Sequence, residues 1–126
     1  MKLFDGNLIS VVKGNSAVIG ITITDAQTGE PYILTGDAVV IFTVKNKKGE
    51  IVIQKTLTSQ DYEEDEQTLE CNISPAETVT LLTGEYDYDC LLYSESENLA
   101  VTFISSNLVV EKAVGLYTDI SGGDAG

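Results

Sequence analysis

Apolar and polar residues alternate with a period of two along most of this chain, from Ala17 to Val114. Successive side chains of a β-strand point to opposite faces, so the alternation predicts strands with one buried and one exposed face. Turn-forming residues separate the alternating segments, as in an antiparallel sheet. The side chains expected to be buried together are Ala17, Ile19, Ile21 and Ile23; Val40, Phe42 and Val44; and Leu69, Cys71 and Ile73.

Two turn signals stand out in the first half of the chain. Residues 25–31 contain Gly29, which can adopt positive φ, and Pro31, which cannot donate to a strand ladder. Residues 46–49 predict a hairpin loop. In the second half, the expected strands are 85–93, 99–104 and 107–114, with a turn at residues 105–107.

One short helix interrupts the strands, near residues 75–82. Ser74 can cap it, Pro75 suits its first position, and Glu77 can bond back to the cap. Gly84 suits a left-handed stop after about two turns. The side chains expected on the buried side of this connector are Leu81 and Leu82.

Seven or eight short strands with one connector helix predict an all-β fold, an antiparallel β-sandwich. The chain has 126 residues, which suits one domain. We assign residues 1–116 to that domain. The Gly-rich segment 117–126 lacks any pattern and is expected to form a flexible tail.

The charge balance excludes several function classes. Asp and Glu number 20 and Lys and Arg 7, for a net charge of −13, and all seven are Lys. Such a chain would repel a nucleic-acid backbone, and it has no Arg to read phosphate or guanine. It also has no His, which removes Ser-His and Cys-His catalysis and His-ligated metals. We expect no catalytic residue, cofactor or metal, and no nucleic-acid, membrane or small-molecule partner.

The segment 61–66 carries five carboxylates in six positions. Calcium prefers several oxygen ligands on a turning backbone, so a calcium site is one interpretation. The segment lacks the glycine and the spacing of a known calcium loop, which favours a solvated loop instead.

The two cysteines, Cys71 and Cys90, both fall within predicted strands. Reduced thiols packed in the core are the favoured interpretation. A disulfide between them and a reactive thiol remain alternatives.

The segment 84–93 places tyrosines and acids on opposite faces of one strand. Tyr86, Tyr88, Cys90 and Leu92 share one face, and Glu85, Asp87 and Asp89 share the other. A Tyr two residues before a Cys resembles the tyrosine corner of immunoglobulin domains. Burial in the core is one interpretation, and recognition of a partner is the other. The candidate partner-binding residues are Tyr86, Asp87, Tyr88, Asp89 and Tyr93.

The order of segments resembles the N-terminal immunoglobulin-like domain of phage baseplate upper proteins and related phage or prophage tail proteins. The resemblance spans roughly Leu8 to Glu111, and its most specific part runs from Ser74 to Asp89. There the Ser-Pro helix start is followed by Gly84-Glu85-Tyr86-Asp87-Tyr88-Asp89. One departure is Ser105-Ser106-Asn107, where the family often has a turn glycine.

The resemblance implies a non-enzymatic virion role: the domain docks to other tail or baseplate proteins, or self-associates, and positions a receptor-binding part. No signal peptide or membrane span is expected, so the protein would be made in the host cytoplasm. A bacterial surface or carbohydrate-binding sandwich is the alternative, because six tyrosines could stack on sugars. A small enzyme is a further alternative.

Overall fold

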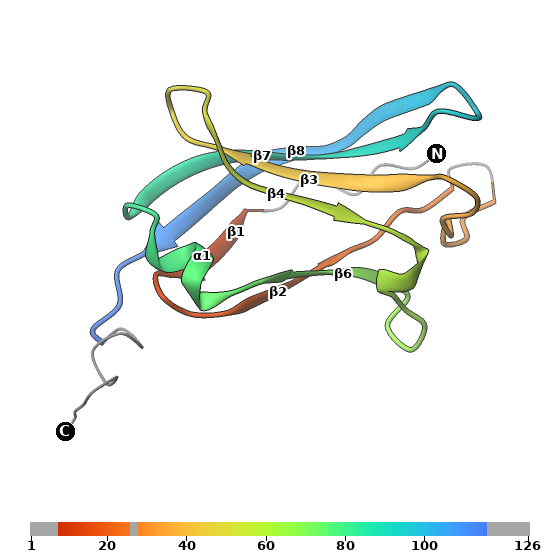
Figure 1. Ribbon diagram of the computed structural model, residues 1–126. Coiled ribbons are helices and arrows are strands. Elements are labelled where there is room, and N and C mark those ends of the chain that lie inside the picture. The colour runs from red at the N-terminus through yellow and green to blue at the C-terminus, as the bar shows by residue number, and fades with distance from the viewer. Residues whose placement is uncertain (1–7, 26–27, 116–126) are drawn as a thin grey trace.

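The protein is an all-β sandwich, described here from a computed structural model that covers residues 8–25 and 28–115. Two sheets stack against each other, as Figure 1 shows. The larger sheet has the strand order β1-β8-β7-β3-β4, and the smaller has the order β2-β6-β5. The strands are β1 (Ile9–Val12), β2 (Ala17–Ile21), β3 (Val39–Lys45), β4 (Ile51–Leu57), β5 (Tyr62–Glu63), β6 (Thr68–Ile73), β7 (Gly84–Ser94) and β8 (Leu99–Glu111).

The period-two faces meet between the sheets and form the core. Val40, Phe42 and Val44 of β3 are all fully buried, and they belong to the same core cluster as Leu69, Cys71 and Ile73 of β6. This confirms the predicted alternation. The predicted tail, 117–126, lies outside the described residues, as does the start of the predicted domain.

The predicted turn at residues 105–107 is wrong, because β8 runs unbroken through it. Ser105 pairs with Asp89 and Asn107 with Asp87 in the register of β7 and β8. These small polar residues lie along the strand, and the Asn107 amide donates a 3.1 Å hydrogen bond to Asp87. The irregularity lies instead between Cys90 and its neighbour, where the register shifts.

The connector helix α1 (Pro75–Val79) has the predicted start and a different end. Ser74 and Glu77 form a reciprocal capping box, with Pro75 in the first turn. The helix ends at Thr80, in right-handed conformation, so it is shorter than the predicted two turns. Gly84 does not stop the helix; with φ of 138° it begins β7.

The residues after α1 also depart in part from the expectation. Leu81 is buried, as expected, whereas the side chain of Leu82 is 77% exposed. Because the helix has already ended at Thr80, the two leucines no longer share one helical face.

Two contacts tie α1 to the rest of the sandwich. The buried Thr78 hydroxyl accepts a 3.0 Å hydrogen bond from the Gly14 amide and donates a 2.8 Å bond to the Asn15 carbonyl, in the β1–β2 turn. Lys55 of β4 contacts both carboxylate oxygens of Glu77, at 2.8 and 2.6 Å. The connector therefore joins the turn before β2 to an edge of the larger sheet.

Within the described residues, no helix is long and apolar enough to cross a lipid bilayer.

Candidate interaction face

The alternation along β7 decides which candidate residues can meet a partner. Asp87 and Tyr93 point to the outer face of the larger sheet and are exposed, and Asp89 is half-buried. Tyr86 and Tyr88 point into the sandwich and are only 7% and 5% exposed. The interpretation that β7 is a core strand is therefore confirmed for the tyrosines. Their rings offer no surface to a partner, which removes both from the candidate set.

The structure has a tyrosine corner, but at Tyr86 and not at Tyr88. The Tyr86 hydroxyl donates a 2.6 Å hydrogen bond to the Leu82 carbonyl, four residues earlier. Tyr88, the residue two positions before Cys90, packs its ring against Phe42 with a centroid separation of 5.5 Å. The prediction of a corner from the spacing to Cys90 therefore pointed to the wrong tyrosine. The position of the corner depends on where β7 begins and not on the distance to Cys90.

An apolar patch covers one end of the outer face of the larger sheet. Cross-strand pairing places Val39 opposite Tyr93, and Tyr93 opposite Ala100. One rung inward, Ile41 lies opposite Leu91. Tyr93 is 40% exposed, Ala100 is exposed, and the other three are half-buried. We call these five residues the outer patch.

The opposite end of the same face is polar and largely self-paired. Lys47 lies 3.2 Å from Glu85 and 3.8 Å from Asp87. Lys45 is the cross-strand neighbour of Asp87, which also accepts the bond from Asn107. These groups satisfy one another, so the outer patch is the part of the face with unused contact area.

A hydrogen-bonded cluster fixes the chain turn beside the outer patch. Asp37 accepts bonds from the Ser94 hydroxyl at 2.6 Å, the Ser96 amide at 3.0 Å and the Ser96 hydroxyl at 2.9 Å. These bonds, led by the one from Ser94, lower the pKa of the Asp37 carboxyl. The cluster joins the start of β3 to the β7–β8 turn, and so holds the rim of the outer patch in place.

The two cysteines are free, buried thiols, which confirms the favoured interpretation and not the disulfide. Cys71 lies on β6 and Cys90 on β7, one in each sheet. Burial raises the pKa of Cys71 to about 11 and that of Cys90 to about 12. Thiols with such pKa values are poor nucleophiles at neutral pH.

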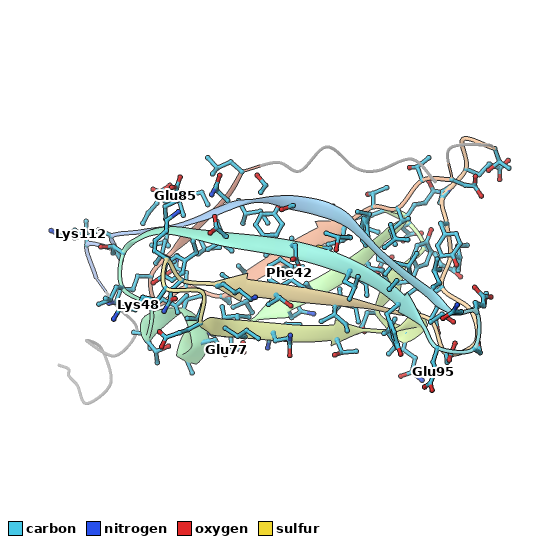
Figure 2. The ribbon with its side chains drawn as sticks, turned by 90° about the horizontal axis from the view of Figure 1, so that it is seen from above. Phe42, Lys48, Glu77, Glu85, Glu95 and Lys112 are labelled. Atoms are coloured by element: carbon cyan, nitrogen blue, oxygen red, sulfur yellow. The ribbon has the colours of Figure 1, made fainter. Side chains whose placement is uncertain are left out.

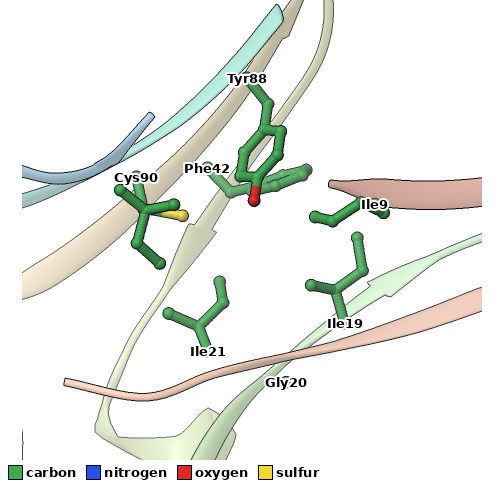
Figure 3. Close-up of a pocket in the computed structure, with 8 residues that line it drawn as sticks. Ile9, Ile19, Gly20, Ile21, Phe42, Tyr88 and Cys90 are labelled. Carbon is green, nitrogen blue, oxygen red and sulfur yellow. The ribbon is translucent and has the colours of Figure 1, made fainter. Parts of the chain in front are cut away.

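A small apolar cavity of about 160 Å³ lies between the sheets, beside β2. Figure 3 shows the Tyr88 hydroxyl pointing into it among aliphatic side chains. The described lining contains no carboxylate or ammonium group; its ionisable groups are the Tyr88 hydroxyl and the Cys90 thiol, and burial raises the pKa of each to about 12. Its lining residues are Ile9, Ile19, Gly20, Ile21, Phe42, Tyr88, Cys90 and Ile104.

The acidic segment 61–66 contains the β5–β6 hairpin, not a cage of carboxylates. Asp61 accepts a 2.8 Å bond from the Thr58 amide and so caps the 3₁₀ turn η1 (Ser59–Asp61). Glu63 accepts a bond from the Asp65 amide, and residues 64–67 are exposed. In the described part of the chain, no group of three acidic or Cys side chains is placed to hold a metal ion.

The tyrosines of the described residues do not gather into one exposed platform. Tyr32 and Tyr62 are half-buried and pack against the core, and Tyr93 is the exposed one among the described tyrosines. Tyr117 lies outside the described residues.

Neither the outer patch nor the Asp37 cluster was predicted from the sequence. A signal for the patch was present, because residues 38–42 are apolar without interruption. In a strand such a run makes both faces apolar, so one apolar face must lie outside the core.

Compared with known protein families and with curated proteins, the chain matches no family model and no curated protein.

Proposed function

We propose that this protein is a non-enzymatic structural module of a phage or prophage tail or baseplate. It docks to other tail subunits through the outer face of its larger sheet and positions a receptor-binding part of the assembly. The tail context rests on the resemblance of the Ser74–Asp89 segment, and the docking role rests on the outer patch.

The observation that carries the docking role is the outer patch itself. Val39, Ile41, Leu91 and Tyr93 form a contiguous apolar surface on the outer face of the larger sheet. Apolar patches of this kind on soluble proteins mark interaction sites. Tyr is also enriched in protein interfaces. The hollow beside Tyr93 and Ala100 has a volume of only about 110 Å³, so this face suits a protein surface better than a small molecule, which needs a larger concave site.

The Ser74–Asp89 segment also supports the role of a rigid structural module. The capping box of Ser74 and Glu77, the Tyr86 corner and the Thr78 bonds all hold the chain in one conformation. These groups are used in internal contacts. A rigid domain loses little conformational entropy on docking, which favours association.

The test is whether the protein is part of the particle. Virions purified from a strain that encodes the protein should contain it at a fixed ratio to the tail-tube subunit, as measured by quantitative mass spectrometry. Antibody raised against the domain should label one end of the tail in electron micrographs.

The matched control is a strain that lacks this coding sequence, whose particles should show no label. Virions that assemble and infect normally without the protein, and that never contain it, would refute the tail assignment.

A further inference from the structure

The lysines of the described residues are concentrated toward one end of the domain's long axis, whereas carboxylates lie at both ends. One end is formed by the β2–β3 connection, the β4–β6 connection and the β7–β8 turn (Figure 1). It carries Asp25, Glu30, Glu95 and Glu97, together with the carboxylates of residues 61–66, and within the described residues no lysine belongs to these connections. We call this end the acidic pole.

The lysines gather at the opposite end, which we call the lysine pole. This end is formed by the β1–β2 turn, the β3–β4 hairpin, α1 and the end of β8. Figure 2 shows Lys48 and Lys112 there, near Glu77 and Glu85, and Glu95 far from them. Lys55 also reaches this end, through its contact with Glu77. The lysines of the described residues that lie in these segments are Lys13, Lys45, Lys47, Lys48 and Lys112.

The outer patch lies at the acidic pole. Val39 begins β3, Tyr93 is near the end of β7, and Ala100 is near the start of β8. Glu95 and Glu97 follow Tyr93 directly in the β7–β8 turn and are exposed. An apolar surface therefore continues into a rim of carboxylates.

The electrostatics of this end act on a neighbouring side chain. The pKa of Tyr32 is raised by burial and then by the negative charges of Glu97 and Asp25. The β7–β8 turn and the β2–β3 connection thus contribute to one negative field beside the patch.

We infer that the outer patch and its acidic rim bind a protein surface with an apolar centre and a rim of Lys and Arg. The inference rests on the proposed docking function and names the chemistry of the partner. Opposite charges across an interface speed encounter and fix orientation. Because no described lysine belongs to the connections of the acidic pole, whereas lysines accompany the acids at the lysine pole, such a partner would hold the domain in one direction.

A second copy of this chain is a poor occupant of the same face. A two-fold interface places the same patch of each copy against the other. Since the outer patch lies at the acidic pole, this pairing would bring Glu95 and Glu97 of both copies together. Repulsion between these carboxylates of the two copies would disfavour association.

The experiment uses the complete chain and two cyclic β-hairpin peptides as probes. One peptide has Leu and Tyr at its centre and Lys at its rim, and the other has Glu in place of each Lys. Binding is followed by NMR amide shifts. We expect the Lys peptide to bind, with shifts centred on Val39, Leu91 and Tyr93, and its affinity to fall about tenfold or more as salt rises from roughly 0.02 M to 0.5 M. The Glu peptide should bind at least about tenfold more weakly.

Two double variants distinguish the effect of the acidic rim from the effect of the net charge of the protein. Glu95→Lys with Glu97→Lys should abolish the preference for the Lys peptide. Glu50→Lys with Glu111→Lys makes the same change in charge at the lysine pole and should retain the preference.

The apolar centre has its own pair of variants. Ile41→Thr should weaken binding, whereas Val18→Thr, at a residue 62% exposed on β2 of the other sheet, should not.

Equal binding of the two peptides, shifts centred on another face, absence of binding, or a dimer in light scattering that Ile41→Thr dissolves would each overturn the inference. The virion test is independent of these results. If the protein is found in tails but its outer patch does not bind the Lys peptide, the proposed function stands and this inference fails. If the outer patch binds the Lys peptide specifically but the protein is absent from virions, the inference stands and the proposed function fails.

Discussion

The hydroxyl of Tyr86 donates a 2.6 Å hydrogen bond to the main-chain carbonyl of Leu82. The bond closes the corner at which the chain leaves the short helix α1 and enters the central strand β7. The Tyr86 ring is 7% exposed, so the side chain joins the core to the corner. This one side chain therefore fixes the direction in which the chain enters β7.

Removing the Tyr86 hydroxyl should cost stability. Tyr86→Phe keeps the ring in the core and deletes the bond to Leu82, so we expect a loss of about 1 kcal/mol in the free energy of unfolding. Chemical denaturation measures it. Tyr93→Phe removes a hydroxyl from the outer face and should change stability by no more than about 0.5 kcal/mol. Equal losses in the two variants would contradict the role assigned to the corner.

The buried Thr78 hydroxyl should matter more. Thr78→Val keeps the shape of the side chain but leaves the Gly14 amide and the Asn15 carbonyl without this partner. Leaving buried polar groups unpaired costs about 1–3 kcal/mol. We expect a loss of that size in urea denaturation, together with faster hydrogen exchange at Gly14. Thr80→Val, at the exposed end of α1, is the matched control, and an unchanged Gly14 exchange rate in Thr78→Val would refute the link.

The contact between Lys55 and Glu77 should make stability depend on acid. The hydrogen bond from Lys55, followed by that from the Ser74 amide, lowers the pKa of Glu77 below its ordinary value of 4.5. A carboxyl with a lowered folded-state pKa stabilises the fold above its unfolded pKa, and this contribution disappears as pH falls through the folded value. Melting temperature should therefore drop below about pH 4.5.

Glu77→Gln should be less stable than the wild type near neutral pH and should show a smaller drop in acid. The control Glu70→Gln, on β6, should keep the full acid dependence. A Glu77→Gln variant whose melting temperature falls in parallel with the wild type would exclude Glu77 as the source.

The two thiols should be protected until the protein unfolds. Burial raises the pKa of Cys71 to about 11, so about one thiol in a thousand would be ionised at pH 8. Cys90, with a pKa of about 12, is less reactive still. Iodoacetamide at pH 8 should label neither residue in native protein and both in urea, as peptide mass spectrometry can show. Rapid labelling of native Cys71 would indicate that the sandwich opens locally.

The sequence predicted most of the architecture because burial on strands leaves a local trace. The alternation of Val40, Phe42 and Val44 and the capping box of Ser74 and Glu77 depend on neighbours a few residues away. Residues whose roles depend on distant partners were harder. Gly84 fits a helix stop or a strand start equally well, and its pairing with Val110 of β8 decides the matter.

The candidate site shows the same limit. Asp87, Asp89 and Tyr93 lie on the outer face, but three of the residues that complete the outer patch, Val39, Ile41 and Ala100, come from β3 and β8. Their alignment is set by strand register, and no motif in the chain records it. Ser105 and Asn107 were mistaken for a turn for a related reason, since small polar residues suit turns and outward strand positions alike.

The parallel pairing of β1 with β8 governs how this domain can be joined to others. Ile9 lies beside Leu108, Val11 beside Val110 and Val12 beside Glu111, so both strands run toward the lysine pole. β1 therefore begins on its side nearer the acidic pole, and β8 ends at the lysine pole. A unit attached ahead of β1 and one attached behind β8 could pull these strands in opposite directions, and such a force would load β1 and β8 in shear across their shared ladder.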